Sequence, residues 1–204
     1  MTKPVYFSLI IIFFFNFPSL LISFEKREDI NISTRSAVIF NTLCSKCHEG
    51  ECSGRLSFDT GSRTASSHIR RYTEESNLSK GKIKEFFALL NHMKKECAIY
   101  MPKQDKWQPG NLSLFMLPSS KGYFVPLGFL ESGVYHIGIK TREDIHFQTE
   151  VLSEHFDHFL NQEICPEKKN NTLQFTIDKP TAVFLRIKSR HPLHIDALKI
   201  EKER

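Results

Sequence analysis

Several features that would point directly to an activity are missing from this chain of 204 residues. It contains one tryptophan, Trp107, and its lysines and arginines are scattered, so no basic tract follows a nucleic-acid backbone. It has no internal repeat, no low-complexity tract, no glycine-rich phosphate loop, and no nucleophile-base pair in its second half. These absences argue against nucleic-acid binding and against an enzyme, so no catalytic residue is predicted.

Long hydrophobic runs are absent except at the N-terminus. There a lysine precedes an apolar run over residues 5–24, and four charged residues end it. This is the pattern of an export signal. The run is long enough to span a bilayer, although Asn16 and Pro18 interrupt it. We expect residues 1–24 to be a signal peptide, with a retained membrane anchor as the alternative. The rest of the chain is then periplasmic or extracytoplasmic.

Cysteines are few, and their number is odd, which in an exported protein calls for an explanation. The run Cys44-Ser45-Lys46-Cys47-His48 is the attachment pattern of a c-type haem. Each thiol adds to one vinyl group of the haem, and the histidine that follows reaches the iron. No second Cys/His pair completes a zinc site. The motif predicts one covalent haem c, attached at Cys44 and Cys47, with His48 as the proximal iron ligand.

Three further cysteines follow the motif, namely Cys52, Cys97 and Cys165. A Cys52–Cys97 disulfide would close a loop of about 45 residues and stabilise the fold in an oxidising compartment. Cys97–Cys165 is the other pairing, and the sequence does not decide between them.

The hydrophobic period changes along the chain. Helices are expected over residues 35–43, 68–72 and 80–97, the last with Ser79 as its N-cap, and a loop over residues 49–67. Beyond residue 110, short runs rich in β-branched and aromatic residues predict an antiparallel β-sandwich of about 90 residues. Residues 153–162 are ambiguous and fit a short helix instead. The expected strands cover residues 114–117, 123–126, 134–140, 145–152, 173–177, 183–188 and 193–200.

Residues 33–102 resemble the cytochrome c family, with a short helix, the Cys44–His48 motif, a loop and a final helix in that order. The resemblance implies an α+β multidomain chain. A small all-α haem domain at residues 33–108 would precede the β-sandwich at residues 110–204. It also implies one-electron transfer to a redox partner protein, with the sandwich as a docking or binding module.

The sixth iron ligand departs from the family pattern. Cytochromes c usually supply a methionine before the final helix, but no methionine lies between His48 and Met93. His68 has the right place in the chain, so it is the first candidate, with Met101 and Met93 as alternatives.

Two other functions remain open at this point. With an open sixth position the protein would be a haem-based sensor or a weak peroxidase. Without haem it would be an exported, disulfide-bonded binding protein.

Overall fold

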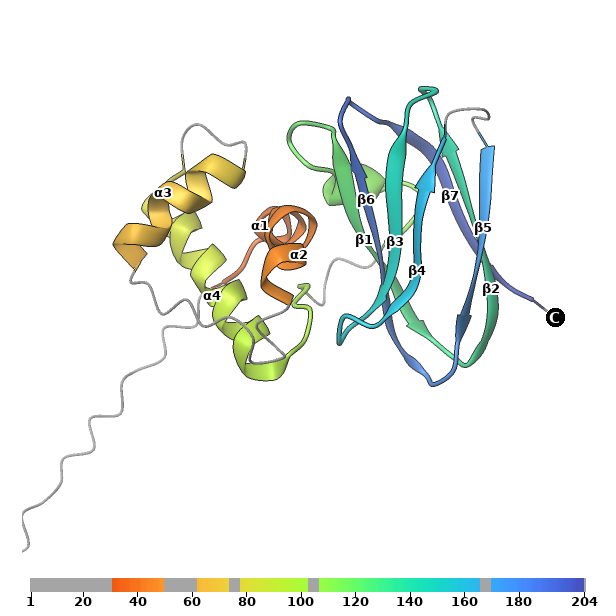
Figure 1. Ribbon diagram of the computed structural model, residues 1–204, viewed down its shortest axis with the longest axis horizontal. Coiled ribbons are helices and arrows are strands. Elements are labelled where there is room, and N and C mark those ends of the chain that lie inside the picture. The colour runs from red at the N-terminus through yellow and green to blue at the C-terminus, as the bar shows by residue number, and fades with distance from the viewer. Residues whose placement is uncertain (1–30, 50–61, 74–77, 103–106, 166–169, 204) are drawn as a thin grey trace, which may run out of the picture.

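A computed structural model describes residues 31–49, 62–73, 78–102, 107–165 and 170–203. Helices occupy the first part of the described chain and strands the second, and the two parts lie against each other (Figure 1). The predicted N-terminal signal or anchor lies outside these residues. Within the described part, no helix is both long and apolar enough to cross a membrane.

The first helical segments run into one another and carry the cysteine motif. Ser33 caps the first helix by accepting a hydrogen bond from the Ser36 amide. A π-helical turn follows and leads directly into the motif. Such turns are rare in proteins and occur frequently at functional sites. The segments are α1 (Thr34–Ile39), the π-helical turn η1 (Phe40–Cys44) and α2 (Ser45–His48).

Two longer helices complete this part: α3 (Ser62–Tyr72) and α4 (Lys80–Glu96). Ser79 accepts a hydrogen bond from the Lys82 amide and so caps α4, as predicted. The helix ends at Cys97, whose φ of 50° lies in the left-handed region that stops a helix. Its apolar side chains recur at helical spacing and form its buried face: Ile83, Phe86, Leu89 and Met93.

The second part is an antiparallel β-sandwich, which confirms that prediction. One sheet has the strand order β1-β6-β3-β4, and the other has the order β5-β2-β7. From Thr172 to Ile177, exposed and buried side chains alternate along β5, as expected when one face of a sheet meets solvent. The strands are β1 (Gly122–Leu130), β2 (Gly133–Thr141), β3 (Phe147–Ser153), β4 (His158–Ile164), β5 (Asn170–Ile177), β6 (Thr181–Ser189) and β7 (Ile195–Lys202).

Three segments differ from the sequence prediction. Residues 62–67 were expected in a loop, but they form the first part of α3. Residues 114–117 do not form a strand: a 3₁₀ helix, η3 (Leu112–Phe115), ends there, and only Met116 bridges to β1. Residues 153–162 do not form a helix, because Phe156 has a positive φ and the Ser153 hydroxyl holds Asp157 in a turn. β4 begins immediately after this turn.

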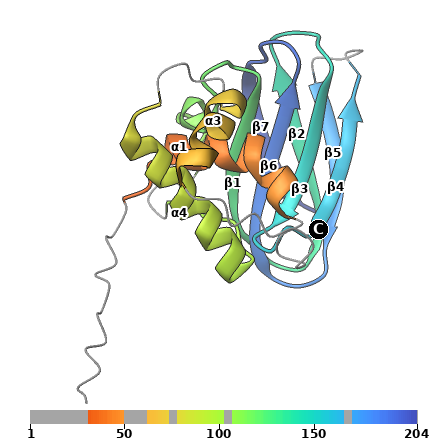
Figure 2. The same ribbon diagram turned by 60° about the vertical axis from the view of Figure 1, so that its left-hand side comes forward.

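The sheet β1-β6-β3-β4 is the middle layer of the molecule. One of its faces packs on the second sheet, and the helices cover the other, with α1 and α2 crossing in front of it in Figure 2. Residues 183–187 of β6 are therefore buried without alternation. An arginine, Arg186, stands in the middle of this buried run and is fully excluded from solvent.

Candidate functional site

The Cys44–His48 segment lies on the middle sheet rather than apart from it. Cys44 ends η1, whereas Cys47 and His48 belong to α2. Ser45, between the two cysteines, is fully buried, while Cys47 is exposed. One side of the segment thus faces the sandwich and the other faces solvent.

A buried ion pair fastens the segment to the sheet. Arg186 on β6 donates from Nε to Glu150 on β3 at 2.5 Å, and both side chains are almost completely buried. The other end of the guanidinium donates to the Ser45 hydroxyl at 2.9 Å and to the Asn41 carbonyl at 3.4 Å. Glu49 lies 3.6 Å from it. Arginine suits this position because its planar fork directs several N–H groups at once.

Lys46 completes the attachment from the helical side. Its ammonium group lies 3.1 Å from the second oxygen of Glu150 and 3.4 Å from the Gln148 side chain. Burial alone would raise the pKa of Glu150, but hydrogen bonds and charge from Arg186 and Lys46 outweigh it and lower that pKa. Glu150 is therefore ionised at neutral pH.

Cys44 is a thiol, not a thiolate, in this fold. Burial raises its pKa to about 12, and the nearby Cys47 adds to the rise, while Lys188 opposes it. The pKa of Lys188 is itself lowered by burial and by the charges of Arg186 and Lys46. A protonated thiol is a poor nucleophile, so Cys44 is protected from reaction as long as the motif segment stays packed on the sheet.

His48 and His68 are brought together, although they come from different helices. Their ring centroids are 6.2 Å apart with the planes at 80°, and Tyr72 lies against His68 at 4.7 Å. Burial lowers the pKa of His68, and the charge His48 would carry lowers it further. Of the other two candidate ligands, Met93 lies in the core on α4, and Met101 packs against the core beyond it.

Cys97 is disulfide-bonded, whereas Cys44, Cys47 and Cys165 carry free thiols. The motif cysteines therefore do not pair with each other in this structure. Cys52, the predicted partner of Cys97, lies outside the described residues, so that pairing stays a prediction.

A second surface, which the sequence analysis did not single out, is the outer face of the sheet β5-β2-β7. β5 exposes four uncharged hydrogen-bonding side chains in a row: Asn170, Thr172, Gln174 and Thr176. Beside them on β2 stands Gly138, opposite Thr172 and Lys199, and a Cβ added there would touch only Lys199, at 3.9 Å. The open face, as we call these five residues, thus has a gap beside a polar row. The strict alternation on β5 was a signal that could have identified it.

Among the ionisable side chains that border the open face, some lie in pairs, and Lys140 on β2, opposite Asn170, is exposed. Lys199 lies 2.6 Å from Glu201 on β7, and His136 on β2 lies 3.6 Å from Glu203. A ligand that follows β5 therefore meets four neutral side chains, with the ammonium group of Lys140 at the Asn170 end of the row.

Comparison with known proteins identifies no family. No family model matches the chain, and no curated protein matches it. A search of solved structures finds a chain described as "CBM4 structure and function", which is 14% identical. The similarity covers 43% of this chain and 80% of that one, with a TM-score of 0.30.

These findings correct the resemblance to the cytochrome c family and the interpretation as a haem electron carrier. No family model supports either, and the described residues contain no group of three or more His, Cys, Asp or Glu side chains that could bind a metal ion. The predicted independent haem domain is not confirmed, since its motif segment is built into the face of the sandwich through Arg186. Covalent haem at Cys44 and Cys47 is not tested by these findings and stays a prediction. The chain is thus a β-sandwich with a helical cover, and no family is shown for it.

Proposed function

We propose that this protein is an exported binding protein whose open face holds a neutral, hydroxyl-rich ligand such as a polysaccharide. The observation that carries the proposal is the row of four uncharged donors and acceptors on β5 beside the gap at Gly138. Amide and hydroxyl groups can both donate and accept hydrogen bonds, which matches a ligand whose own groups do the same.

The position of β5 supports this interpretation. By strand order it is an edge of its sheet, and edge strands commonly carry lysine or other charged side chains that discourage association. The outward row of β5 contains no charge. On the opposite face of the sandwich, α1 and η1 pack against β1 and β6. The open face lies on the other sheet, where its four β5 side chains are exposed to solvent.

Because no aromatic side chain stands in the row, hydrogen bonds rather than ring stacking would supply the specificity. Each neutral hydrogen bond contributes only about 1 kcal/mol net. Several must therefore act together, and an extended ligand that follows the strand would meet all four side chains. A polymer fits this requirement better than a single small sugar.

The proposal can be tested by measuring binding of the protein to a panel of neutral soluble polysaccharides by calorimetry. Thr172→Ala combined with Gln174→Ala should weaken binding about tenfold or more, since two hydrogen bonds are lost. Gly138→Leu should also weaken it by filling the gap, and the open space at its Cβ allows the sheet to form.

The matched control is Gln162→Ala, which removes the same side chain from an exposed position on β4 in the other sheet. It should bind like the wild type. If no neutral polysaccharide binds, or if Gln162→Ala weakens binding as much as the open-face variants, the proposal is wrong.

A further inference from the structure

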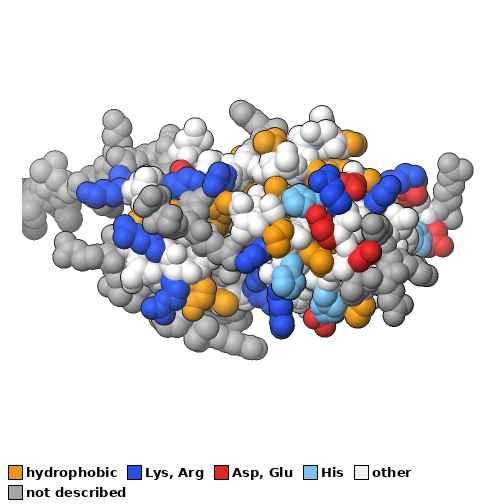
Figure 3. Space-filling model, turned by 90° about the horizontal axis from the view of Figure 1, so that it is seen from above, with side chains coloured by type: hydrophobic (Ala, Val, Ile, Leu, Met, Phe, Trp, Pro, Cys, Tyr) orange, Lys and Arg blue, Asp and Glu red, His pale blue; other side chains and the backbone are white. Residues whose placement is uncertain are grey.

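The net charge of the protein is confined to its helical half. Residues 31–106 contain 13 Lys and Arg against 8 Asp and Glu, a net of +5, whereas residues 107–204 contain 12 of each. On the face shown in Figure 3, the charged side chains over the helical part are mostly Lys and Arg, whereas those over the sandwich are Lys and Arg mixed with Asp and Glu. The molecule therefore has a positively charged helical half and a sandwich without net charge.

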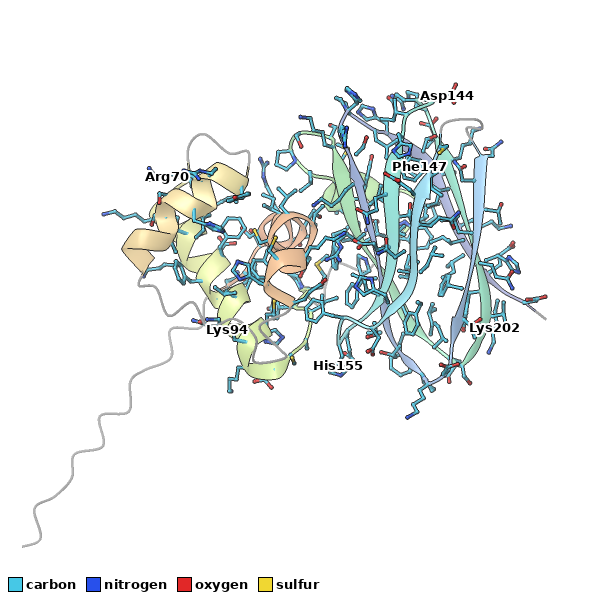
Figure 4. The ribbon with its side chains drawn as sticks, in the orientation of Figure 1. Arg70, Lys94, Asp144, Phe147, His155 and Lys202 are labelled. Carbon is cyan, nitrogen blue, oxygen red and sulfur yellow. The ribbon has the colours of Figure 1, made fainter. Side chains whose placement is uncertain are left out.

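Part of the positive charge forms one surface on α3 and α4. Lys80, Lys84 and Lys95 are all exposed, and their spacing of four and eleven residues places them on one side of α4. Lys95 also lies 3.1 Å from the carboxylate of Glu96. Arg70 and Arg71 are exposed on α3, which packs against α4. We call these five residues the basic helical surface. Arg70 and Lys94, labelled in Figure 4, both lie on the helical part, away from the strands.

The chain enters the described structure at this surface. The amide and hydroxyl of Ser33 both donate to Glu85 on α4, at 3.0 and 2.7 Å. These hydrogen bonds lower the pKa of Glu85 although burial opposes them, so the ionised carboxylate holds the start of α1. Glu85 adjoins Lys84 in the sequence. The point where residues 1–32 reach the fold is thus beside the basic residues of α4.

The residues that precede this point set the distance to the apolar run. Eight residues, 25–32, separate that run from Ser33. Fully extended, they span at most about 28 Å. Electrostatic attraction between exposed charges acts over about 8–10 Å at physiological salt. A retained apolar run would therefore hold the basic helical surface within about 28 Å of the bilayer, a distance from which a bend of the linker brings it into the range of the bilayer's field.

We propose that the N-terminal apolar run is retained as an anchor, the alternative to a signal peptide, and that the basic helical surface docks on the anionic membrane to which this run tethers the protein. Clusters of Lys and Arg next to a membrane segment are attracted to anionic headgroups. Tyr72 is half-exposed beside Arg71, and tyrosine favours the boundary between headgroups and water. In this orientation the sandwich, which has no net charge, points away from the membrane, with the open face presented to solvent.

The test uses the full chain in lipid nanodiscs, either zwitterionic or with a third of anionic lipid, and measures acetylation of each lysine by mass spectrometry. Lys80, Lys84 and Lys95 should react about three- to tenfold more slowly in the anionic discs. This protection should disappear at about 0.5 M salt, where charges are screened within a few ångströms. Lys140 and Lys199 on the sandwich should react equally in both discs.

Charge reversal provides the matched pair of variants. Lys80→Glu with Lys84→Glu should remove the protection of Lys95, whereas Lys140→Glu with Lys199→Glu should leave it unchanged. Equal labelling of the helical lysines in both discs, protection of the sandwich lysines to the same degree, or failure of the chain to join the discs would each overturn the proposal. Polysaccharide binding is measured separately on the other face, so the two proposals can fail independently.

Discussion

The buried ion pair beneath the motif segment predicts a large and non-additive response to mutation of Arg186 and Glu150. Removing one partner of a buried ion pair leaves the other charged and uncompensated, which costs about 3–5 kcal/mol. After Glu150→Leu, the nearest carboxylate to Arg186 is that of Glu49, at 3.6 Å. After Arg186→Met, Glu150 keeps only Lys46, whose side chain is 37% exposed. Each single variant should therefore lose about 3–5 kcal/mol of unfolding free energy.

The double variant Arg186→Met with Glu150→Leu should recover most of this loss, because apolar side chains of similar size can replace a buried ion pair at little cost. Lys46→Met should cost about 1 kcal/mol or less, since a half-exposed ammonium group is screened by water. Urea unfolding followed by far-ultraviolet circular dichroism at pH 7 measures all four variants. If the two single losses simply add in the double variant, the ion pair is not coupled and the reasoning fails.

The same pair predicts the direction of the acid response. The pKa of Glu150 is lower in the folded protein than its ordinary value of 4.5. Its contribution to stability is therefore complete above pH 4.5 and is lost as the pH falls through the lower, folded value. The midpoint of urea unfolding should decline below about pH 4 in the wild type. The double variant should show a shallower decline, and an equally steep one would show that other carboxylates cause it.

Three further predictions concern single sites. Gly122→Ala should destabilise the protein by about 1–3 kcal/mol, because the new Cβ would lie 2.6 Å from the Ile187 carbonyl oxygen. Gly110→Ala is the control: its Cβ would meet open space, so its unfolding free energy in the same urea assay should be nearly unchanged. At pH 8, iodoacetamide should modify Cys44 far more slowly than the exposed Cys47 and Cys165, because its pKa is about 12; equal rates in peptide mass mapping would contradict the burial argument. If Cys44 and Cys47 attach haem, protein made with haem-attachment machinery should show a visible absorption band that survives acid. If His68 is the sixth iron ligand, His68→Ala should change that spectrum. A colourless wild-type protein would contradict the cofactor prediction.

The β-sandwich was predictable because the sequence signals of its strands are local. Alternation on β5 and turn residues between strands both act over a few neighbouring positions. Helix α4 was predictable for the same reason, since Ser79 and the apolar spacing lie within its own segment. The turn at Phe156 was not, because it depends on a side-chain contact between Ser153 and Asp157 that replaces helical hydrogen bonds.

The packing of the motif segment on the sheet could not be predicted from the sequence. Arg186 stands in a strand of apolar residues, where a lone arginine is normally expected to point to solvent. Its partners Ser45 and Asn41 lie 141 and 145 residues earlier in the chain. No periodicity links positions so far apart. The Cys-x-x-Cys-His spacing was visible locally and predicted a cofactor, but local spacing says nothing about the surface on which the segment rests.

The separation between Ser45 and Arg186 also constrains the order of folding. A chain is synthesised from its N-terminus, so the segment with Cys44 and Cys47 exists before β6, the strand whose Arg186 holds Ser45. Until β6 pairs with β3, the guanidinium that holds Ser45 is not in place, and the Cys44 segment lacks its hydrogen bonds to the sheet. Contacts between such distant positions form slowly, because a long loop must close first. Any covalent chemistry at Cys44 thus has its best opportunity during synthesis and early folding, and closure of the last strands ends that period.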